Sequence, residues 1–198
     1  MPMDQFWYAF IPLFVAFDGV GLLPVFWGLA HRLDAPHRRR AAAEAVLTAL
    51  GITVGFLLVS KLVFRLMGLE IADLMVAGGV ILIVLCLREL LFPEQPPESV
   101  PRSPGIVPLG VPLLAGPAAM TTVLLVRDQA GWPITLAALL ATLLLVWLIL
   151  RGSEWLMGRL GTEGARVISN ISSLILTGFG VMLIRRGVMA VLASPMGP

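Results

Sequence analysis

The stretch Asp18-Gly-Val-Gly-Leu-Leu-Pro24 puts an acidic residue, two glycines and a proline into the middle of an apolar segment, Phe6–Ala30. Glycine weakens a helix, and proline fits best in the first turn of a helix, where its missing N–H is not needed. The sequence therefore predicts a helix that is interrupted at residues 18–21. A second half-helix follows the interruption and has Pro24 in its first turn.

A matching interruption is expected in the second half of the chain. The stretch Ala115-Gly-Pro-Ala-Ala-Met-Thr-Thr122 lies in another apolar segment, Ile106–Val126. Gly116 is suited to end one half-helix, because glycine readily adopts the left-handed conformation of a C-terminal cap. Pro117 is suited to begin the next half-helix.

Further short matches between the two halves occur in the same order along the chain. The tripeptide Leu-Met-Gly occurs at Leu66–Gly68 and again at Leu156–Gly158. A pair of small residues, Gly78-Gly79 in one half and Ser172-Ser173 in the other, is followed by an apolar run. Self-similarity of this kind indicates an internal repeat. We expect three helices in each repeat.

The composition requires lipid as the solvent for most of the chain. Of 198 residues, 58% are hydrophobic and only 13% are charged, whereas about 25% are charged in a typical soluble domain. A membrane-spanning helix needs about 20 apolar residues. Six such spans use up the chain and are expected at about Phe6–Ala30, Ala42–Phe64, Ala72–Leu91, Ile106–Val126, Pro133–Leu150 and Val167–Ile184.

The predicted fold is an all-α integral membrane protein of six transmembrane helices, built as two inverted three-helix repeats in which helices one and four are discontinuous. The first repeat covers residues 1–92, a proline-rich cytoplasmic linker covers 93–105, and the second repeat covers 106–198. More basic residues lie beside the span ends after helices one, three and five than on the other side. By the positive-inside rule both termini are expected outside the cytoplasm.

The two interruptions predict a binding site at the middle of the bilayer. Each second half-helix points its N-terminus, with unpaired N–H groups and the positive end of the helix dipole, at the midplane. Because the repeats are inverted, the two N-termini converge from opposite sides. Discontinuous helices in matching positions are typical of the substrate site of secondary transporters. Convergent N–H groups favour an anion such as a carboxylate.

Asp18 is the only acidic residue in the middle of a predicted span, and such a residue is a functional candidate. Three roles compete: a cap that accepts N–H bonds near Val20–Gly21, a site for a cation or an ammonium group, and a carrier of a coupling proton. Thr121 and Thr122 either donate their hydroxyls to a substrate or bond back to carbonyls one turn earlier. The small pairs favour close helix packing, with direct contact to a substrate as the alternative.

Other classes of function are disfavoured. The net charge of +2 comes from arginines beside the spans, which argues against a nucleic-acid partner. Cys86 is the only cysteine, so neither an intramolecular disulfide nor a cysteine-based zinc cluster is available. Both histidines, His31 and His37, lie in a loop, and Asp18 has no acidic partner within a span. We therefore expect neither an enzyme nor a cofactor, and coupling to a proton or Na⁺ stays open.

The sequence resembles the MarC family of inner-membrane proteins, also grouped as neutral amino acid transporters. The resemblance covers nearly the whole chain and rests on Asp18-Gly-Val-Gly-x-x-Pro24, Ala77-Gly-Gly79 and Pro112-Leu-Leu-Ala-Gly-Pro-Ala-Ala-Met-Thr-Thr122. It implies a six-helix fold in the bacterial inner membrane and transport of glycine or alanine. Gly19 and Leu22 stand where the family usually has Pro and Asn, and Ala118 stands where it usually has Gly.

The leading hypothesis is a secondary carrier of a small neutral amino acid. Its carboxylate would bind the half-helix N–H groups and its ammonium would lie near Asp18. The alternatives are a cation or proton channel, an exporter of another small solute, and a structural membrane subunit. The expected partners are the substrate and the lipid bilayer, and the oligomeric state is left open. The expected substrate-binding residues are Asp18, Gly19, Gly21, Gly116, Pro117, Ala118, Thr121 and Thr122.

Overall fold

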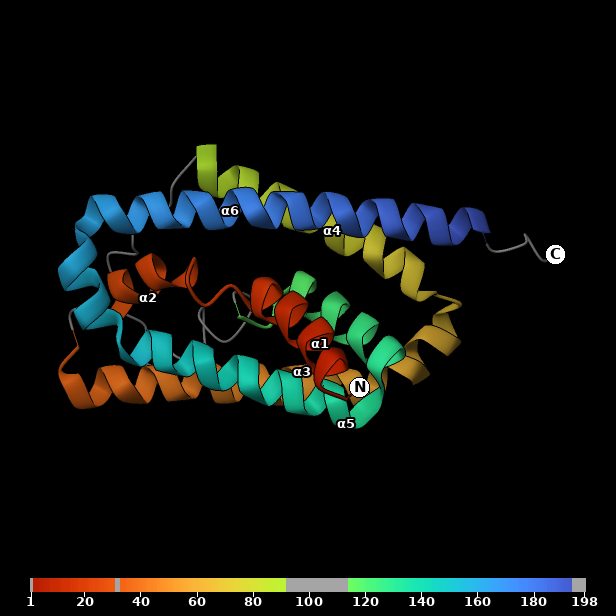
Figure 1. Ribbon diagram of the computed structural model, residues 1–198, viewed down its shortest axis with the longest axis horizontal. Helices are drawn as coiled ribbons and strands as arrows, with labels where there is room; N and C mark the ends of the chain where they lie inside the picture. The colour runs from red at the N-terminus through yellow and green to blue at the C-terminus, as the bar shows by residue number, and fades with distance from the viewer. Residues whose placement is uncertain (1, 31–32, 92–113, 194–198) are drawn as a thin grey trace.

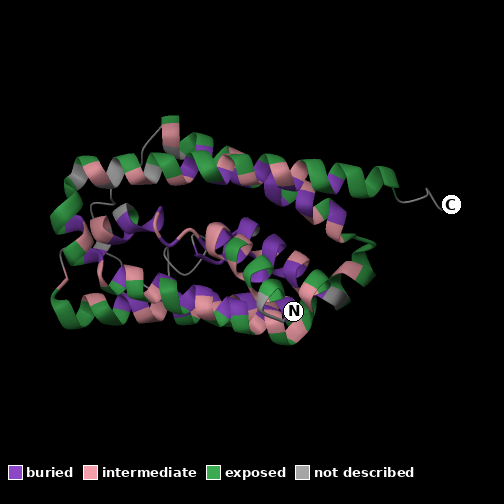
Figure 2. Cartoon of the chain, viewed as in Figure 1, coloured by how far each residue is buried: buried purple, intermediate pink, exposed green. Residues whose placement is uncertain are grey.

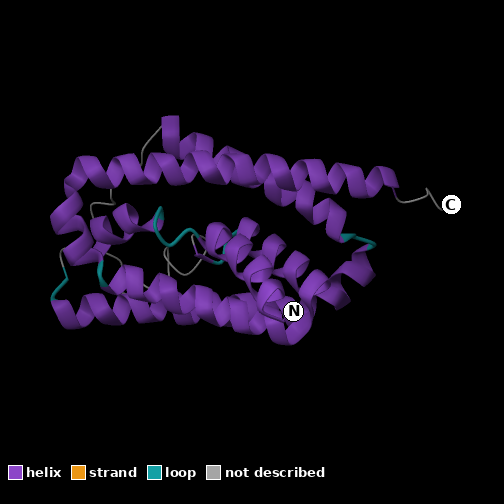
Figure 3. Cartoon of the chain, in the orientation of Figure 1, coloured by secondary structure: helices purple, strands orange, loops and turns teal. Residues whose placement is uncertain are grey.

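A computed structural model describes residues 2–30, 33–91 and 114–193 of the chain. The predicted linker at 93–105 and the first part of the predicted fourth span, up to residue 113, lie outside the described residues. All regular secondary structure in the described ranges is α-helical (Figure 3). The helices are α1 (Pro2–Phe17), α2 (Leu22–Ala30), α3 (Ala35–Met67), α4 (Ile71–Leu91), α5 (Pro117–Arg151) and α6 (Ser153–Ala193).

Four of these helices are long and apolar enough to cross a membrane. Their qualifying segments are Ala35–Ser60, Ile71–Arg88, Ala118–Arg151 and Asn170–Ala193. The predicted first span is divided into α1, of 16 residues, and α2, of 9 residues. Each half is shorter than the roughly 20 residues that a bilayer requires, which is the consequence of the interruption at residues 18–21.

The closest helix packing lies between α4 and α6, which cross near one face of the molecule (Figure 1). A Cβ atom built on Gly79 would lie 2.6 Å from the carbonyl oxygen of Gly180, and one built on Gly180 would lie 2.9 Å from the carbonyl oxygen of Gly79. Gly187 lies in the same way against Ala72 and Val76, so the two helices are antiparallel. The sequence assigned Gly79 to close packing, and the structure agrees.

The main core forms where α1 and α3 pack against α5. Phe17, Leu13 and Phe26 from the first two helices are at most 2% exposed, as are Leu139 and Leu143 from α5. The outward faces are apolar as well. In the apolar segment of α6 only 22% of the residues are buried, and Figure 2 shows that most of this helix is exposed or intermediate. Such a surface suits contact with lipid rather than water.

α5 and α6 each contain a sharp kink. Gly131 has φ of 77° and ψ of 171°, and Gly161 has φ of 66° and ψ of 179°, so the backbone is not helical at either residue. α5 therefore consists of two helical segments that meet at Gly131, which lies between the predicted fourth and fifth spans. Residues 151–166 were expected to connect the fifth and sixth spans and are instead largely helical on both sides of Gly161. Glycine suits both kinks because it adopts a positive φ without steric cost.

The two halves of the chain are tied together at one end of the molecule. The Arg38 guanidinium in the first turns of α3 pairs with the carboxylate of Glu154 at the start of α6. The same guanidinium lies 5.8 Å from the ring centroid of Trp27 in α2. Asp34 is the N-cap residue of α3, but its side chain pairs with His37 rather than with a helix N–H group.

We expect Gly79→Ala to lower stability by about 1–3 kcal/mol, because the added methyl group overlaps backbone atoms of α6 that cannot move aside. Gly55→Ala is the matched control, since a Cβ there would have no neighbour within 4 Å. It should leave stability unchanged or raise it by up to about 1 kcal/mol. Thermal unfolding of the two variants in detergent compares them. Equal melting temperatures would contradict the proposed close contact.

Candidate functional site

The interruption of the first helix is formed by Asp18 itself. Its backbone has φ of 38°, a left-handed conformation that Asp and Asn adopt more readily than most residues. Its N–H donates to the carbonyl of Phe14 at 3.2 Å, and its carbonyl accepts from the N–H of Leu22 at 3.0 Å. Asp18 therefore closes the hydrogen bonds of α1 and opens those of α2. The sequence predicted the break at residues 18–21, and the structure assigns its positive φ to Asp18 rather than to a glycine.

The Asp18 side chain caps α2. Oδ1 accepts a hydrogen bond from the backbone N–H of Gly21 at 3.0 Å, which is the contact of an N-cap residue with the third residue after it. The capping role predicted for Asp18 is thus confirmed. A Cβ atom on Gly21 would lie 2.1 Å from Oδ2 of Asp18, so the residue at this position has to be glycine while the cap is in place.

The interruption packs tightly against α5. A Cβ atom on Gly19 would lie 2.7 Å from a methyl group of Val146. Gly19 and Gly21 are both buried, whereas the Asp18 side chain is only partly buried. The two glycines thus let the chain turn within a confined space, and the partly buried Asp18 lies at the more open side of the turn.

A cavity of about 260 Å³ lies on that open side. This volume falls just below the roughly 300–1,000 Å³ of pockets for drug-sized ligands, so it suits a smaller solute. The interruption and the end of α1 contribute Phe14, Val15, Asp18, Gly19 and Val20 to its wall. The opposite wall consists of Ile168, Ile171, Ser172, Ile175 and Leu176 from α6.

The α6 wall was not among the predicted site residues. Its members recur every three to four positions, which places them on one face of a helix. Ser172 is the only polar side chain on that face, and the sequence had noted it as a small residue for helix packing. The sequence does show a serine among isoleucines that share one helix face, which could have suggested a polar contact there. This pattern alone does not predict which other helix the face packs against.

α5 begins where the sequence predicts the second interruption, and the half-helix expected before it lies outside the described residues. Gly116 is the N-cap residue, with φ of −78° and ψ of 174°, and Pro117 follows in the first turn. The predicted start at Pro117 is confirmed. The left-handed conformation predicted for Gly116 is wrong, because its backbone is extended. No side chain caps this helix end, in contrast to the Asp18 cap of α2.

Both interruptions border the same small cluster of side chains. Ala118, in the first turn of α5, is 6% exposed and packs in a cluster with Leu176 and Val15. Those two residues also line the 260 Å³ cavity. The start of α5 therefore lies behind the wall of the cavity that contains Asp18. Of the predicted site residues, Asp18 and Gly19 line the cavity directly, and Ala118 packs behind its wall.

The two threonines of α5 are both 1% exposed. Thr121 donates from Oγ1 to the carbonyl of Leu74 on α4 at 3.4 Å, so it joins two helices rather than bonding back within its own. Oγ1 of Thr122 has no hydrogen-bond partner among the residues that the structure describes. The same holds for the hydroxyls of Thr53, Thr142 and Ser153, and a buried hydroxyl without a partner costs about 1–3 kcal/mol.

We expect Asp18→Ala to lower stability by about 1–3 kcal/mol, because it removes the cap of α2 and leaves alanine with a positive φ. Asp18→Asn should unfold at nearly the wild-type temperature, since the amide oxygen can still accept from Gly21 and Asn tolerates positive φ. Thermal unfolding in detergent separates the two variants. If Asp18→Asn were as unstable as Asp18→Ala, capping would not be the structural role of this side chain.

Comparison with known proteins identifies the family. Residues 3–192 match the model of the MarC family integral membrane proteins. The chain is 30% identical to a UPF0056 membrane protein of Pyrococcus abyssi, over 94% of this chain and 95% of that one. It is 27% identical to the UPF0056 inner membrane protein YhgN of Escherichia coli, over 94% and 97% of the two chains. No solved structure matches significantly. The chain therefore belongs to the MarC family of integral membrane proteins.

Proposed function

We propose that this protein is a secondary transporter of a small neutral amino acid, such as glycine or alanine. The proposal rests on one observation about the cavity next to Asp18: Asp18 lines it directly, and the uncapped start of α5 lies behind its wall. An acid such as Asp18 suits an ammonium group, and the N–H groups of an uncapped helix start suit a carboxylate.

The two helix starts would have different tasks. The N-terminus of α2 is already occupied by the Asp18 carboxylate, so it attracts a positive group rather than an anion. The N-terminus of α5 has no side-chain cap, and the backbone N–H groups of its first turn after Pro117 belong to Ala118 and Ala119. We assign the substrate carboxylate to these N–H groups and to the Thr122 hydroxyl. The ammonium group would lie at Asp18, with Ser172 on the facing wall.

The six-span inverted repeat is part of the proposal. It is supported by reciprocal contacts between α4 and α6, in which Gly79 lies against Ile184 and Gly180 lies against Ile83. Reciprocal pairs of this kind are what a two-fold axis produces. Spans three and six must run in opposite directions, and α4 and α6 do.

We also propose the inner membrane as the location, with both termini outside the cytoplasm. The related YhgN of Escherichia coli is named an inner membrane protein. In this orientation the pair between Arg38 and Glu154 lies on the cytoplasmic side. The binding cavity next to Asp18 would then open to one side of the membrane at a time as the halves move apart and together.

Asp18→Asn is expected to reduce uptake of labelled glycine and alanine into proteoliposomes at least tenfold, because the charge that holds the ammonium group is lost while the cap remains. Asp73→Asn is the matched control, since Asp73 is an exposed acid in the first turn of α4. Unchanged flux in Asp18→Asn would contradict the ammonium role. Saturable flux with counterflow supports a carrier, whereas a linear current without exchange would indicate the channel alternative.

Thr122→Val is expected to raise the half-saturating substrate concentration severalfold without lowering stability, because it removes a buried hydroxyl that has no partner in the described part of the chain. Thr135→Val serves as the control. Its hydroxyl is equally buried in α5 but already donates to the carbonyl of Gly131 at 2.7 Å. Flux titrations of the two variants give the comparison, and equal half-saturation in both would remove Thr122 from the site.

A further inference from the structure

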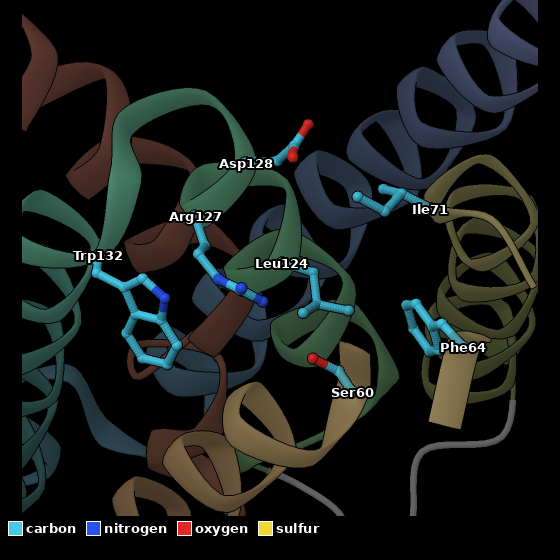
Figure 4. A pocket seen from close by; sticks show the side chains of 7 residues that line it. All are labelled: Ser60, Phe64, Ile71, Leu124, Arg127, Asp128 and Trp132. Carbon is cyan, nitrogen blue, oxygen red and sulfur yellow. The ribbon is translucent and has the colours of Figure 1, made fainter. Parts of the chain in front are cut away.

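A second cavity, of about 210 Å³, lies where α3 ends, α4 begins and α5 bends at Gly131. It is a separate space from the cavity at Asp18, and the two have no wall residue in common. Figure 4 shows the Arg127 side chain extending into it between Trp132 and Ser60. Its walls come from three helices, including Ser60 and Phe64 of α3, Ile71 of α4, and Arg127, Asp128 and Trp132 of α5.

The bend in α5 builds the charged wall of this cavity. Residues five apart on a straight helix point in directions about 140° apart, so Arg127 and Trp132 would not meet on one. Gly131, with φ of 77°, turns the chain back between them. The Arg127 guanidinium then lies 4.8 Å from the ring centroid of Trp132. A stacked guanidinium keeps its N–H edge available, in the geometry that binds a carboxylate with two hydrogen bonds.

Arg127 has no ion-pair partner in the described ranges, and no described group accepts a hydrogen bond from it. Arg38 at the other end of the molecule is, by contrast, paired with Glu154. Arg151 and Arg159 also stack on tryptophans but are exposed at the surface, whereas Arg127 is half-buried and lines a cavity. Its donors are thus directed into a confined space that no described carboxylate fills.

The remaining polar groups make the cavity suited to a zwitterion rather than to a simple anion. Asp128 lies on the same wall, but its carboxylate is exposed and points away from Arg127 (Figure 4). Positive and negative charge are therefore offered at two separate places. Ser60 is 2% exposed, and its hydroxyl donates to the carbonyl of Leu57 at 3.0 Å, so its oxygen can still accept a hydrogen bond. Asp128 also disfavours the phosphate of an anionic lipid headgroup.

We propose that this cavity is a second binding site, which takes the carboxylate of a small zwitterionic amino acid on Arg127. It would receive the solute at the end of the molecule before the solute reaches Asp18. The choice of ligand rests on the proposed transport function, whereas the carboxylate site itself rests on the Arg127 geometry.

The binding test uses the full-length purified chain and the fluorescence of Trp132. Glycine, and acetate more weakly, should change the emission of the wild type at millimolar concentration, while methylammonium should not. The change should persist in Asp18→Asn, which leaves this cavity intact. It should be lost in Arg127→Gln and in Trp132→Phe. Arg151→Gln and Trp147→Phe are the matched controls, because that pair has the same stacking, 5.1 Å from the ring centroid, outside either cavity.

The flux test connects the site to transport. In proteoliposomes, Arg127→Gln should raise the half-saturating glycine concentration about tenfold and leave the maximal rate within twofold, whereas Arg151→Gln should alter neither. Absence of glycine flux in the wild type would refute the proposed transport function. The fluorescence measurement would then still test whether Arg127 binds a carboxylate. Unchanged half-saturation in Arg127→Gln, with normal wild-type flux, would refute only the second site.

Two further outcomes would overturn the proposal. Emission that responds equally in Arg127→Gln and the wild type would place the response elsewhere. The same measurement in nanodiscs of phosphatidylcholine, with and without phosphatidylglycerol, tests the lipid alternative. A response to phosphatidylglycerol that glycine does not compete with would assign Arg127 to a lipid phosphate. Competition by glycine supports the solute site.

Discussion

An interrupted helix inside a membrane must satisfy its backbone polar groups within the protein, because lipid offers no hydrogen bonds. In this chain one residue meets that requirement at the first interruption. The N–H and carbonyl of Asp18 continue the bonding of α1 and α2, and its side chain accepts from Gly21. The other features of the site depend on this arrangement, because it determines where the negative charge lies. It also leaves no room for a side chain at Gly21, next to the Asp18 carboxylate, or at Gly19, where the chain turns against Val146.

The two helix starts differ in how they are capped. A carboxylate caps α2, whereas α5 begins with the uncapped Gly116. In the proposed inverted repeat, two equivalent uncapped helix starts would offer two anion sites, and the acid at one of them would give the proposed site one negative and one positive end. This is why the proposed substrate is a zwitterion. The same logic applies at the second cavity, where Arg127 and Asp128 point apart.

The α4–α6 contact and the bends show how small residues control the helix arrangement. Gly79 and Gly180 allow backbone contact along two antiparallel helices, as is typical of membrane helices, which gain little from burying apolar surface against each other. Gly131 and Gly161 instead divide α5 and α6, each into two helical segments that meet at a kink. Periodicity and composition do not distinguish these two uses of glycine, so the helical start of α6 was expected to be a loop.

The sequence by itself determined that the chain is an all-helical membrane protein, that its first helix breaks at Asp18, and that a helix starts at Pro117. These features follow from local causes: too few charged residues for a soluble surface, and the backbone preferences of Asp, Gly and Pro. Only the tertiary structure decided which residues share a cavity. The pairing of Asp18 with the α6 stripe, of Ala118 with Val15, and of Arg127 with Trp132 depends on how helices pack and bend. Those contacts join residues whose separation along the chain carries no local signal.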